Sequence, residues 1–212
     1  MYSLSSNPDL SNLSSSPRVF STHMPLHTLQ VPLNDSPCKI VYLCMNLKDV
    51  LVSHWYFWCN NLGKEVETTT SLTFESMFDS FCSGVHFFGS FWKNVLSYWR
   101  KSLEDPNHVL FMRFEELKTE PRGQLKKLAE FLGCPFSEEE EENSGSLDKI
   151  LDLCSLSNLS DLEVNKTGKT SYNVHYYSFF RKGEIGDWKN HLTLEMENKI
   201  DKIIEAKFHG SV

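Results

Sequence analysis

The sequence lacks the features that define several common classes of protein. It contains no stretch that approaches the ~20 apolar residues of a membrane-spanning helix, so we expect no membrane as a partner. Basic residues are scarce, with 21 Lys and Arg against 28 Asp and Glu, and the net charge of -7 argues against nucleic acid as a partner. Residues 1–16 show no basic stretch followed by an apolar one, so we expect no signal peptide and a cytoplasmic location.

Metal-binding and kinase motifs are missing as well. None of the six cysteines belongs to a C-x-x-C pair, and no histidine stands at zinc-ligand spacing from one. We therefore expect free thiols and no bound metal. No G-x-x-x-x-G-K followed by Ser or Thr occurs, which disfavours a nucleotide kinase or a GTPase.

Apolar runs and amphipathic segments alternate along the chain. Three short runs rich in β-branched and aromatic residues predict strands, and the second is almost continuously apolar, as is typical of a strand buried on both faces of a parallel sheet. These runs span residues 17–22, 38–44 and 109–114. Apolar residues three and four apart predict helices over 49–60, 74–81, 91–99, 121–132, 147–154 and 196–204. The alternation predicts an α/β fold with a parallel sheet flanked by helices.

The composition predicts one packed domain. A hydrophobic fraction of 40% and an aromatic fraction of 13% suffice for one sizeable core. We expect residues 1–16 to form a loose leader and residues 17–212 a single domain. Within it, the acidic run 138–142 predicts a solvated loop and helix start, and residues 65–71 and 160–179 are expected to be loops.

The run with the most chemical information spans residues 180–190 and reads Phe-Arg-Lys-Gly-Glu-Ile-Gly-Asp-Trp-Lys-Asn. Its two adjacent cations, Arg181 and Lys182, suit a phosphate, because Arg supplies a planar fork of donors and Lys a point charge. Gly183 lets a backbone N–H approach an anion closely. A basic pair taken alone is more simply a solvated pair, and it is the complete string that favours a phosphate site.

The complete string resembles the C-terminal signature of the plant cytosolic sulfotransferases. This family transfers a sulfuryl group from 3′-phosphoadenosine 5′-phosphosulfate (PAPS) to a hydroxyl-bearing small molecule, without a metal. The resemblance implies that Arg181, Lys182 and Gly183 hold the 3′-phosphate of PAPS. It also implies a P-loop-NTPase-like fold and extends, through further motifs in order and spacing, over residues 7–210.

A second motif, Pro-Arg-Val-Phe-Ser-Thr-His-Met-Pro over residues 17–25, is similar to the family's strand that ends in Thr-His. The resemblance implies that His23 is the catalytic base. The chemistry is consistent, because a neutral imidazole can accept a proton from an acceptor hydroxyl as its oxygen attacks sulfur. Without this context, a histidine at the end of a strand is more often structural.

A third motif follows the apolar run 38–44 and resembles the family's Arg-Asn-x-Lys-Asp turn and the helix after it. The resemblance implies that Ser53, on this helix, contacts the 3′-phosphate near a helix N-terminus, which already favours an anion. Met45 stands where the family has an Arg that contacts the same phosphate. A thioether cannot replace that guanidinium, and the lost contact costs about 1.5–3 kcal/mol, or about ten- to a hundredfold in affinity.

Two further positions of the nucleotide site depart from the family. Phe114 replaces the Tyr of an Arg-Tyr-Glu-Glu-Leu segment, and the lost hydroxyl contact would cost about 0.5–1.5 kcal/mol. Leu156 stands where an adenine-stacking Phe is common.

The family's N-terminal strand and its phosphosulfate-binding loop, Pro-Lys-x-Gly-Thr-Thr-Trp, do not occur in this sequence. We therefore expect a truncated or degenerate paralogue, or an incomplete gene model, with little or no activity.

Three functional hypotheses remain open. The first is a PAPS-dependent sulfotransferase whose acceptor is a desulfoglucosinolate, a flavonoid or a hormone-like alcohol, with the strongest similarity to the desulfoglucosinolate group. The second is a non-catalytic protein that binds the nucleotide or a small molecule, and the third is an interaction partner of an intact sulfotransferase. The dimer motif of animal relatives matches at Lys189 and Thr193 but not at Leu194 and Asn198, which favours a monomer.

Overall fold

The residues that the computed structural model describes are 18–29, 38–61, 73–85, 89–142 and 145–209 of the 212-residue chain. The expected leader at 1–16 and the expected polar loop at 65–71 lie outside the described residues. Every helix within the described ranges is too short or too polar to cross a bilayer.

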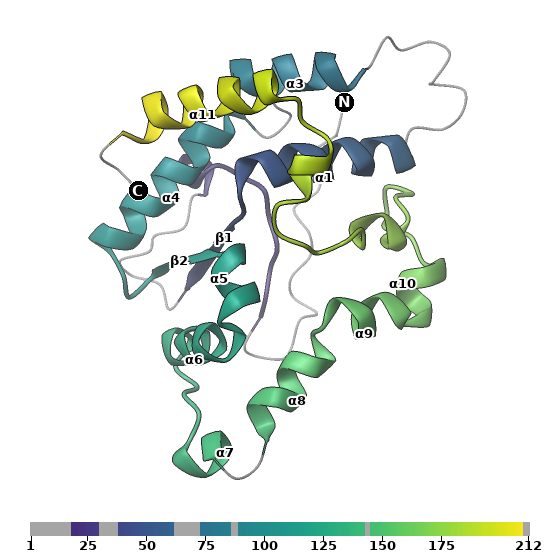
Figure 1. Cartoon of the computed structure of the whole chain (residues 1–212). Helices are drawn as coiled ribbons and strands as arrows, with labels where there is room; N and C mark the ends of the chain where they lie inside the picture. The colour runs from purple at the N-terminus through teal and green to yellow at the C-terminus, as the bar shows by residue number, and fades with distance from the viewer. Residues whose placement is uncertain (1–17, 30–37, 62–72, 86–88, 143–144, 210–212) are drawn as a thin grey trace.

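Two parallel strands form the sheet of the described residues (Figure 1). β1 (Ile40–Cys44) and β2 (Val109–Arg113) pair in register from the first residue of each to the last. Parallel strands need a long crossover, which the helices between them supply. The strand predictions for 38–44 and 109–114 are confirmed, and the fold is the expected parallel sheet flanked by helices.

The strand predicted at 17–22 is not formed over its described residues. Residues 18–25 have no regular structure and lead into a 3-10 turn, η1, at Leu26–Thr28. Val19 and Phe20 are 93% and 62% exposed, so neither is packed against a sheet. The prediction was wrong because β-branched and aromatic residues favour a strand only where a pleated surface is present to pack against.

Helices make up the greater part of the described chain. The six helix predictions are confirmed, with small shifts at their ends, and the acidic run 138–142 forms a short helix. The helices are α1 (Leu47–Asn61), α3 (Phe74–Ser83), α4 (Phe91–Glu104), α5 (Phe114–Thr119), α6 (Pro121–Leu132), α7 (Glu138–Glu142), α8 (Ser146–Leu153), α9 (Leu156–Asp161), α10 (Glu163–Thr167) and α11 (Leu194–Phe208).

Local start and stop signals explain where several helices begin and end. At the start of α3, the Thr73 side chain accepts the Ser76 N–H while the Ser76 hydroxyl accepts the Thr73 N–H, which forms a capping box. α3 ends at Gly84, whose φ is 76°. Pro121 occupies the first turn of α6, and Gly133, with φ 81°, ends that helix in the left-handed conformation.

Residues 160–179, predicted to be a loop, contain more structure than expected. They include the end of α9, all of α10 and a 3-10 turn, η3, at Tyr176–Phe179. α9 and α10 are six and five residues long, too short to leave a helical period in the sequence. Capping rather than amphipathicity starts α9, because the Ser155 side chain accepts the N–H of Asn158.

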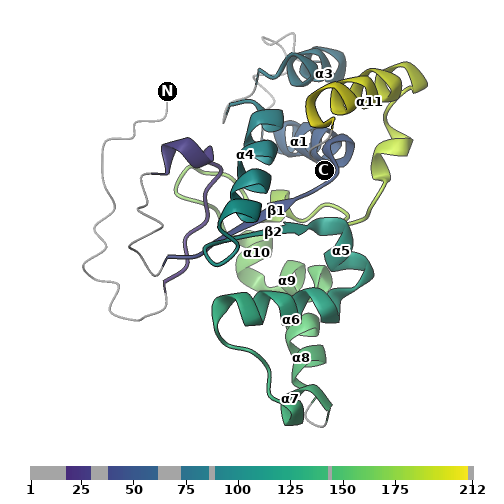
Figure 2. The same ribbon diagram turned by 90° about the vertical axis from the view of Figure 1, so that its left-hand side faces the viewer.

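The main hydrophobic core joins α1, α3, α4 and α11. Leu51 of α1 and Ile200 of α11 are fully buried. They belong to the same core as three nearly buried aromatic residues, Phe78 and Phe81 of α3 and Trp92 of α4. Figure 2 shows these four helices grouped on one side of the two strands. The C-terminal helix is therefore packed onto the helix that follows β1.

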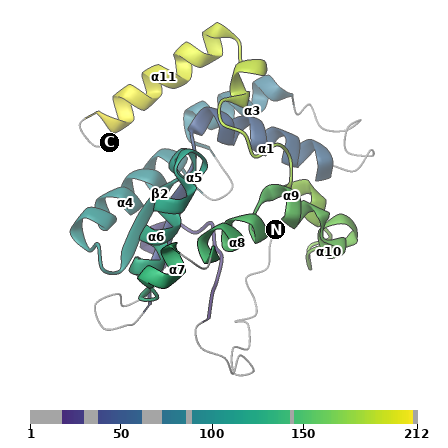
Figure 3. The same ribbon diagram turned by 60° about the horizontal axis from the view of Figure 1, so that its bottom comes forward.

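α8, α9 and α10 form an arm that leads from α6 back towards α1 (Figure 3). α8 contacts α6, α10 contacts η3, and η3 contacts α1. The chain then reaches a further 3-10 turn, η4 (Asp187–Asn190), which also contacts α1. Residues 176–190, which contain the predicted phosphate motif, thus lie along α1.

Candidate nucleotide site

The carboxyl ends of β1 and β2 meet at one edge of the sheet. Because the strands are in register to their last residues, Met45 and Phe114 follow them at the same edge, and both are half-buried. The N–H of Asn46 donates to Glu115 Oε1 at 2.7 Å, which ties the two turns together. Open α/β sheets bind ligands outside this edge. Met45 and Phe114 therefore lie where the sequence leads us to expect a nucleotide.

The first turn of α1 fixes the C-terminal motif in place. Asp49 is 3% exposed, and its two carboxylate oxygens accept the N–H of Gly186 at 2.8 Å and the N–H of Trp188 at 3.0 Å. These two bonds replace the water that the buried carboxylate has lost. They also join two segments that lie 137 residues apart in the sequence.

Lys48, the residue before Asp49 on α1, ties α11 to the same region. Its ammonium group lies 3.3 Å from a carboxylate oxygen of Glu197 and 2.8 Å from one of Asp201. The same group lies 4.2 Å from the centre of the Trp188 ring. Lys48 is 6% exposed, and these partners offset the burial of its charge.

A fully buried carboxylate lies at the centre of the predicted phosphate motif. Asp187, whose side chain is 0% exposed, accepts hydrogen bonds from the guanidinium of Arg181 and, at 2.7 Å, from the ammonium of Lys182. Asn190 donates to it at 3.0 Å, and a ring nitrogen of His191 lies 3.2 Å from it. The hydrogen bonds from Lys182 and Arg181 hold the pKa of Asp187 well below its usual range, so the carboxylate is ionised at neutral pH.

The two cations keep capacity for a further anion. The side chain of Lys182 is 45% exposed and that of Arg181 is 22% exposed. Arg181 Nε is buried and has no hydrogen-bond partner among the described residues, a state that buried donors seldom adopt. Two positive charges against the one negative charge of Asp187 leave the cluster with a net positive charge.

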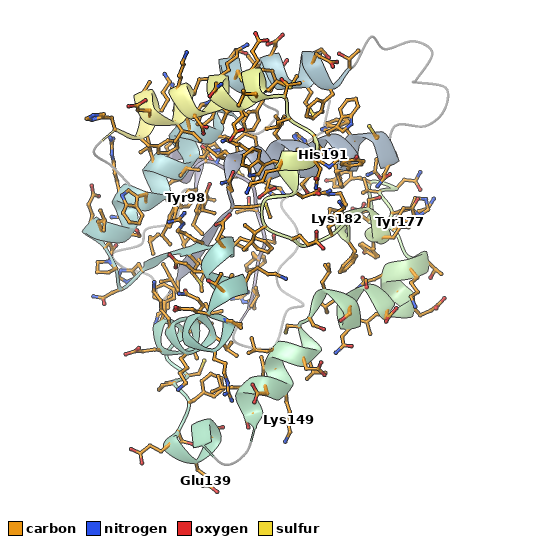
Figure 4. The ribbon with its side chains drawn as sticks, viewed as in Figure 1. Tyr98, Glu139, Lys149, Tyr177, Lys182 and His191 are labelled. Atoms are coloured by element: carbon orange, nitrogen blue, oxygen red, sulfur yellow. The ribbon has the colours of Figure 1, made fainter. Side chains whose placement is uncertain are left out.

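Ser53 stands on the helix that contacts this cluster. The Arg181 guanidinium lies 5.1 Å from the centre of the Tyr56 ring, and that ring packs edge-on against His191 at 5.3 Å. Ser53 precedes Tyr56 by three residues on α1, and residues three apart share a helix face. Figure 4 shows Lys182 between α1 and the α8–α10 arm, and His191 beside α1. Helical spacing therefore puts Ser53 on the same face of α1 as Tyr56, the residue whose ring Arg181 contacts.

Gly183 is required at its position for two reasons. Its φ of 61° is in the left-handed region, which favours glycine. A Cβ atom at this residue would also lie 2.8 Å from Cδ2 of Leu156, so a side chain here would force the Leu156 side chain to shift. The residue expected near the adenine, Leu156, is therefore in contact with the predicted phosphate motif.

The expected catalytic base lies on a different segment. His23 is exposed and belongs to the stretch that leads into η1, which packs against α4. This stretch is fastened by Tyr98 of α4, whose hydroxyl donates to the Met24 carbonyl at 2.8 Å. Burial raises the pKa of Tyr98, so the hydroxyl keeps the proton that it donates. The structure thus places His23 on the α4 side, whereas the cations pack against α1.

The sequence singles out the cations of this site but gives no role to its carboxylates. Asp187 stands inside the predicted phosphate motif, and Asp49 stands in the turn after β1. An acidic side chain within a phosphate motif predicts an ion pair with the cations of that motif, because its negative charge must be neutralised if an anion is to bind beside it. The sequence could therefore have predicted an ion pair for Asp187, whereas no sequence pattern indicates that Asp49 contacts residues 186–188.

Comparison with families and curated proteins gives consistent matches over the whole chain. The family model described as the sulfotransferase domain matches residues 2–212. Cytosolic sulfotransferase 1 of Arabidopsis thaliana is 64% identical over 212 residues, which cover 100% of this chain and 63% of that protein. Cytosolic sulfotransferase 5 of the same plant is 62% identical over 211 residues, with 100% and 64% covered. The chain thus spans less than two thirds of the length of these relatives.

Comparison with solved structures agrees with the sequence matches. A mouse sulfotransferase complexed with PAP superimposes with a TM-score of 0.72 at 26% sequence identity. The match covers 90% of this chain and 65% of the mouse chain.

Proposed function

The chain belongs to the sulfotransferase family, and from this premise we propose that it binds PAPS and takes part in the transfer of its sulfuryl group to a hydroxyl-bearing small molecule. The observation that carries the proposal is the pair Arg181 and Lys182, held beside Gly183 at the face of α1 that bears Ser53. This cluster supplies charge, hydrogen-bond donors and a close backbone approach, which are the properties that a phosphate site needs. The names of the Arabidopsis relatives support a cytosolic location.

Ser53, Arg181, Lys182 and Gly183 hold the 3′-phosphate in this proposal. Among the described residues, the features that fit an anion are the unpartnered Nε of Arg181, the exposed part of the Lys182 side chain, and the absence of a side chain at Gly183, whose φ is 61°. The mouse sulfotransferase with PAP supports a site for this kind of nucleotide. PAPS supplies the sulfuryl group when bound.

His23 acts as the general base and accepts the proton of the acceptor hydroxyl. Its exposure leaves the imidazole accessible to an acceptor, and the bond from Tyr98 to the Met24 carbonyl steadies the backbone beside it. Positioning of this kind contributes to catalysis because it lowers the entropy that the reacting groups lose.

Turnover is expected to be weak. Met45 places a thioether at the sheet edge where the family has a guanidinium, and Phe114 beside it lacks the hydroxyl of Tyr. Loss of one charge-assisted contact lowers nucleotide affinity by about ten- to a hundredfold. The acceptor belongs to the desulfoglucosinolate, flavonoid or hormone-like class, and residues 17–212 act as one monomeric domain.

Transfer of a labelled sulfuryl group tests this proposal. The 212-residue chain and Arabidopsis cytosolic sulfotransferase 1 are assayed side by side with labelled PAPS and acceptors of the three classes. We expect transfer by this chain to be at least about tenfold slower than by the relative, and lost in His23→Ala. Transfer as fast as that of the relative would contradict weak turnover, and transfer that survives His23→Ala would contradict the role of His23.

A non-catalytic nucleotide-binding protein is the second candidate. The observation that favours it is the combination of a complete Arg-Lys-Gly cluster with Met45 at the sheet edge. Equilibrium binding of 3′-phosphoadenosine 5′-phosphate (PAP) without any labelled product would select this candidate. Absence of both binding and transfer would contradict both.

A further inference from the structure

We infer that Asp187 is a positioning residue, which holds Arg181 and Lys182 in the arrangement that selects nucleotides carrying a 3′-phosphate; this inference rests on the proposed nucleotide site. Asp187 is not a phosphate contact itself, because its side chain is 0% exposed and a carboxylate repels an anion. Its effect reaches the nucleotide through the two cations.

The carboxylate of Asp187 is saturated by the chain itself. Oδ1 accepts from Lys182 at 2.7 Å and from Asn190 at 3.0 Å. Oδ2 accepts from Arg181 and lies 3.2 Å from a ring nitrogen of His191. An ionised carboxylate offers about four lone-pair sites, so these four groups leave little room for any other donor.

The two cations, in contrast, are held by Asp187 but keep N–H donors that are not used in hydrogen bonds to it. A guanidinium carries about five N–H donors and an ammonium about three, and each gives Asp187 only part of this capacity. Arg181 Nε has no partner among the described residues, and 45% of the Lys182 side chain is exposed. The cluster therefore presents donors of fixed direction and a net positive charge.

Asp187 is itself fixed on both sides. The residues before and after it, Gly186 and Trp188, both donate their backbone N–H to the buried carboxylate of Asp49 on α1. The peptide that carries Asp187 therefore cannot turn away from the helix without breaking two hydrogen bonds. In this way a helix placed by β1 determines where the two cations stand.

Fixing long cationic side chains in advance reduces the entropy that they lose when an anion binds. The gain applies only to the phosphate that these cations contact. The affinity for nucleotides with a 3′-phosphate, such as PAP, should therefore depend on Asp187. The affinity for adenosine 5′-phosphate (5′-AMP), which lacks that group, should not. A residue that merely stabilises the fold would affect both nucleotides alike.

The experiment compares PAP with 5′-AMP by isothermal titration on the 212-residue chain and on Asp187→Asn. The wild-type chain should prefer PAP, and Asp187→Asn should reduce that preference by at least about tenfold while 5′-AMP affinity stays the same. Asp105→Asn is the matched control, because Asp105 also contacts a Lys and a His, at 3.6 Å and 2.8 Å, but lies between α4 and β2. The control should keep the wild-type preference.

A second variant and a second readout cover the case in which Asp187→Asn folds poorly. Asn190→Ala removes one neutral donor from the carboxylate and should shift the nucleotide preference in the same direction by a smaller factor. The acetylation rate of Lys182 by an amine-specific reagent, read by mass spectrometry, reports on the Asp187 contact without any nucleotide. It should rise in Asp187→Asn and stay unchanged in Asp105→Asn.

The outcomes separate this inference from the proposed function. A wild-type preference for PAP that survives in Asp187→Asn overturns the inference and leaves the proposed function intact. No wild-type preference for PAP overturns the proposed 3′-phosphate site, and the acetylation rate then decides whether Asp187 positions Lys182. An unchanged acetylation rate in Asp187→Asn overturns the positioning role itself.

Discussion

The ionisation of Asp187 makes the stability of the protein sensitive to acid. Lys182 and Arg181 lower the pKa of Asp187 in the folded chain, whereas the unfolded chain has the ordinary value of about 4. A lowered folded-state pKa contributes stability that is fully present above the unfolded pKa and is lost as the pH falls towards the folded pKa. The two other groups that face the carboxylate are the neutral Asn190, at 3.0 Å, and His191, at 3.2 Å.

We therefore expect the wild-type chain to lose more stability than Asp187→Asn when the pH falls from about 5 to about 3. Urea unfolding at the two pH values gives the free energies of unfolding. The comparison isolates Asp187, because all other carboxylates titrate in both proteins. Equal losses in the two proteins would show that the pKa of Asp187 is not lowered by folding.

Met45 offers a gain-of-function prediction at the sheet edge. Met45→Arg restores a guanidinium at the carboxyl end of β1, next to Phe114, and we expect PAP to bind about tenfold more tightly or better. Met45→Leu is the control, because it keeps an apolar side chain of similar volume and should leave the affinity unchanged. Titration calorimetry measures both. Equal affinity of Met45→Arg and wild type would show that position 45 does not face the nucleotide.

The sequence could predict the cations of the site but not the way in which they are held. Arg181, Lys182 and Gly183 stand together in one string, so their chemistry is visible without a structure. The support from Asp49 depends on a contact across 137 residues, and no local pattern encodes it. Gly183 shows the same limit, because its left-handed backbone and its close approach to the Leu156 side chain are both features of the folded chain.

At the scale of the element, one glycine inside α6 and one directly after its last residue have opposite expected effects. Gly133 ends the helix with φ 81°, and Gly133→Ala should lower the free energy of unfolding by about 1 kcal/mol. Gly123 lies inside the helix with no atom within 4 Å of an added Cβ, and Gly123→Ala should raise it by about 0.5–1 kcal/mol. Urea midpoints measure both. Shifts of the same sign would contradict the assigned end of α6.

Elements with strong patterns could be predicted from the sequence, and elements that depend on neighbours could not. β1 and β2 have apolar runs that are paired in the structure, whereas residues 18–22 have a similar composition but stay exposed. Propensity alone does not distinguish the two cases. α9 and α10 escape prediction for a different reason, since helices of six and five residues carry less than two turns of pattern.

At the scale of the whole molecule, the packing of α11 on α1 joins the C-terminal region to the sheet. Ile200 of α11 is 0% exposed and lies in the same core as Leu51 of α1. Ile200→Ala should lower the free energy of unfolding by about 2–5 kcal/mol, because it leaves a cavity.

The control lies on the same helix. Leu194 is 72% exposed, and Leu194→Ala should change the free energy of unfolding by less than about 0.5 kcal/mol. Chemical denaturation of both variants provides the comparison. An equally small effect of Ile200→Ala would mean that α11 is not packed in the core.

The central claim is that these 212 residues form a folded sulfotransferase-family unit with a site for a 3′-phosphorylated nucleotide. A thermal melt of the purified chain with and without PAP tests it most directly, because a ligand that binds only the native state raises the midpoint. We predict a cooperative transition that moves upward with PAP, with a stabilisation of about 2.7 kcal/mol when PAP is at about a hundred times its dissociation constant. A cooperative transition whose midpoint does not move at any PAP concentration would contradict the claim.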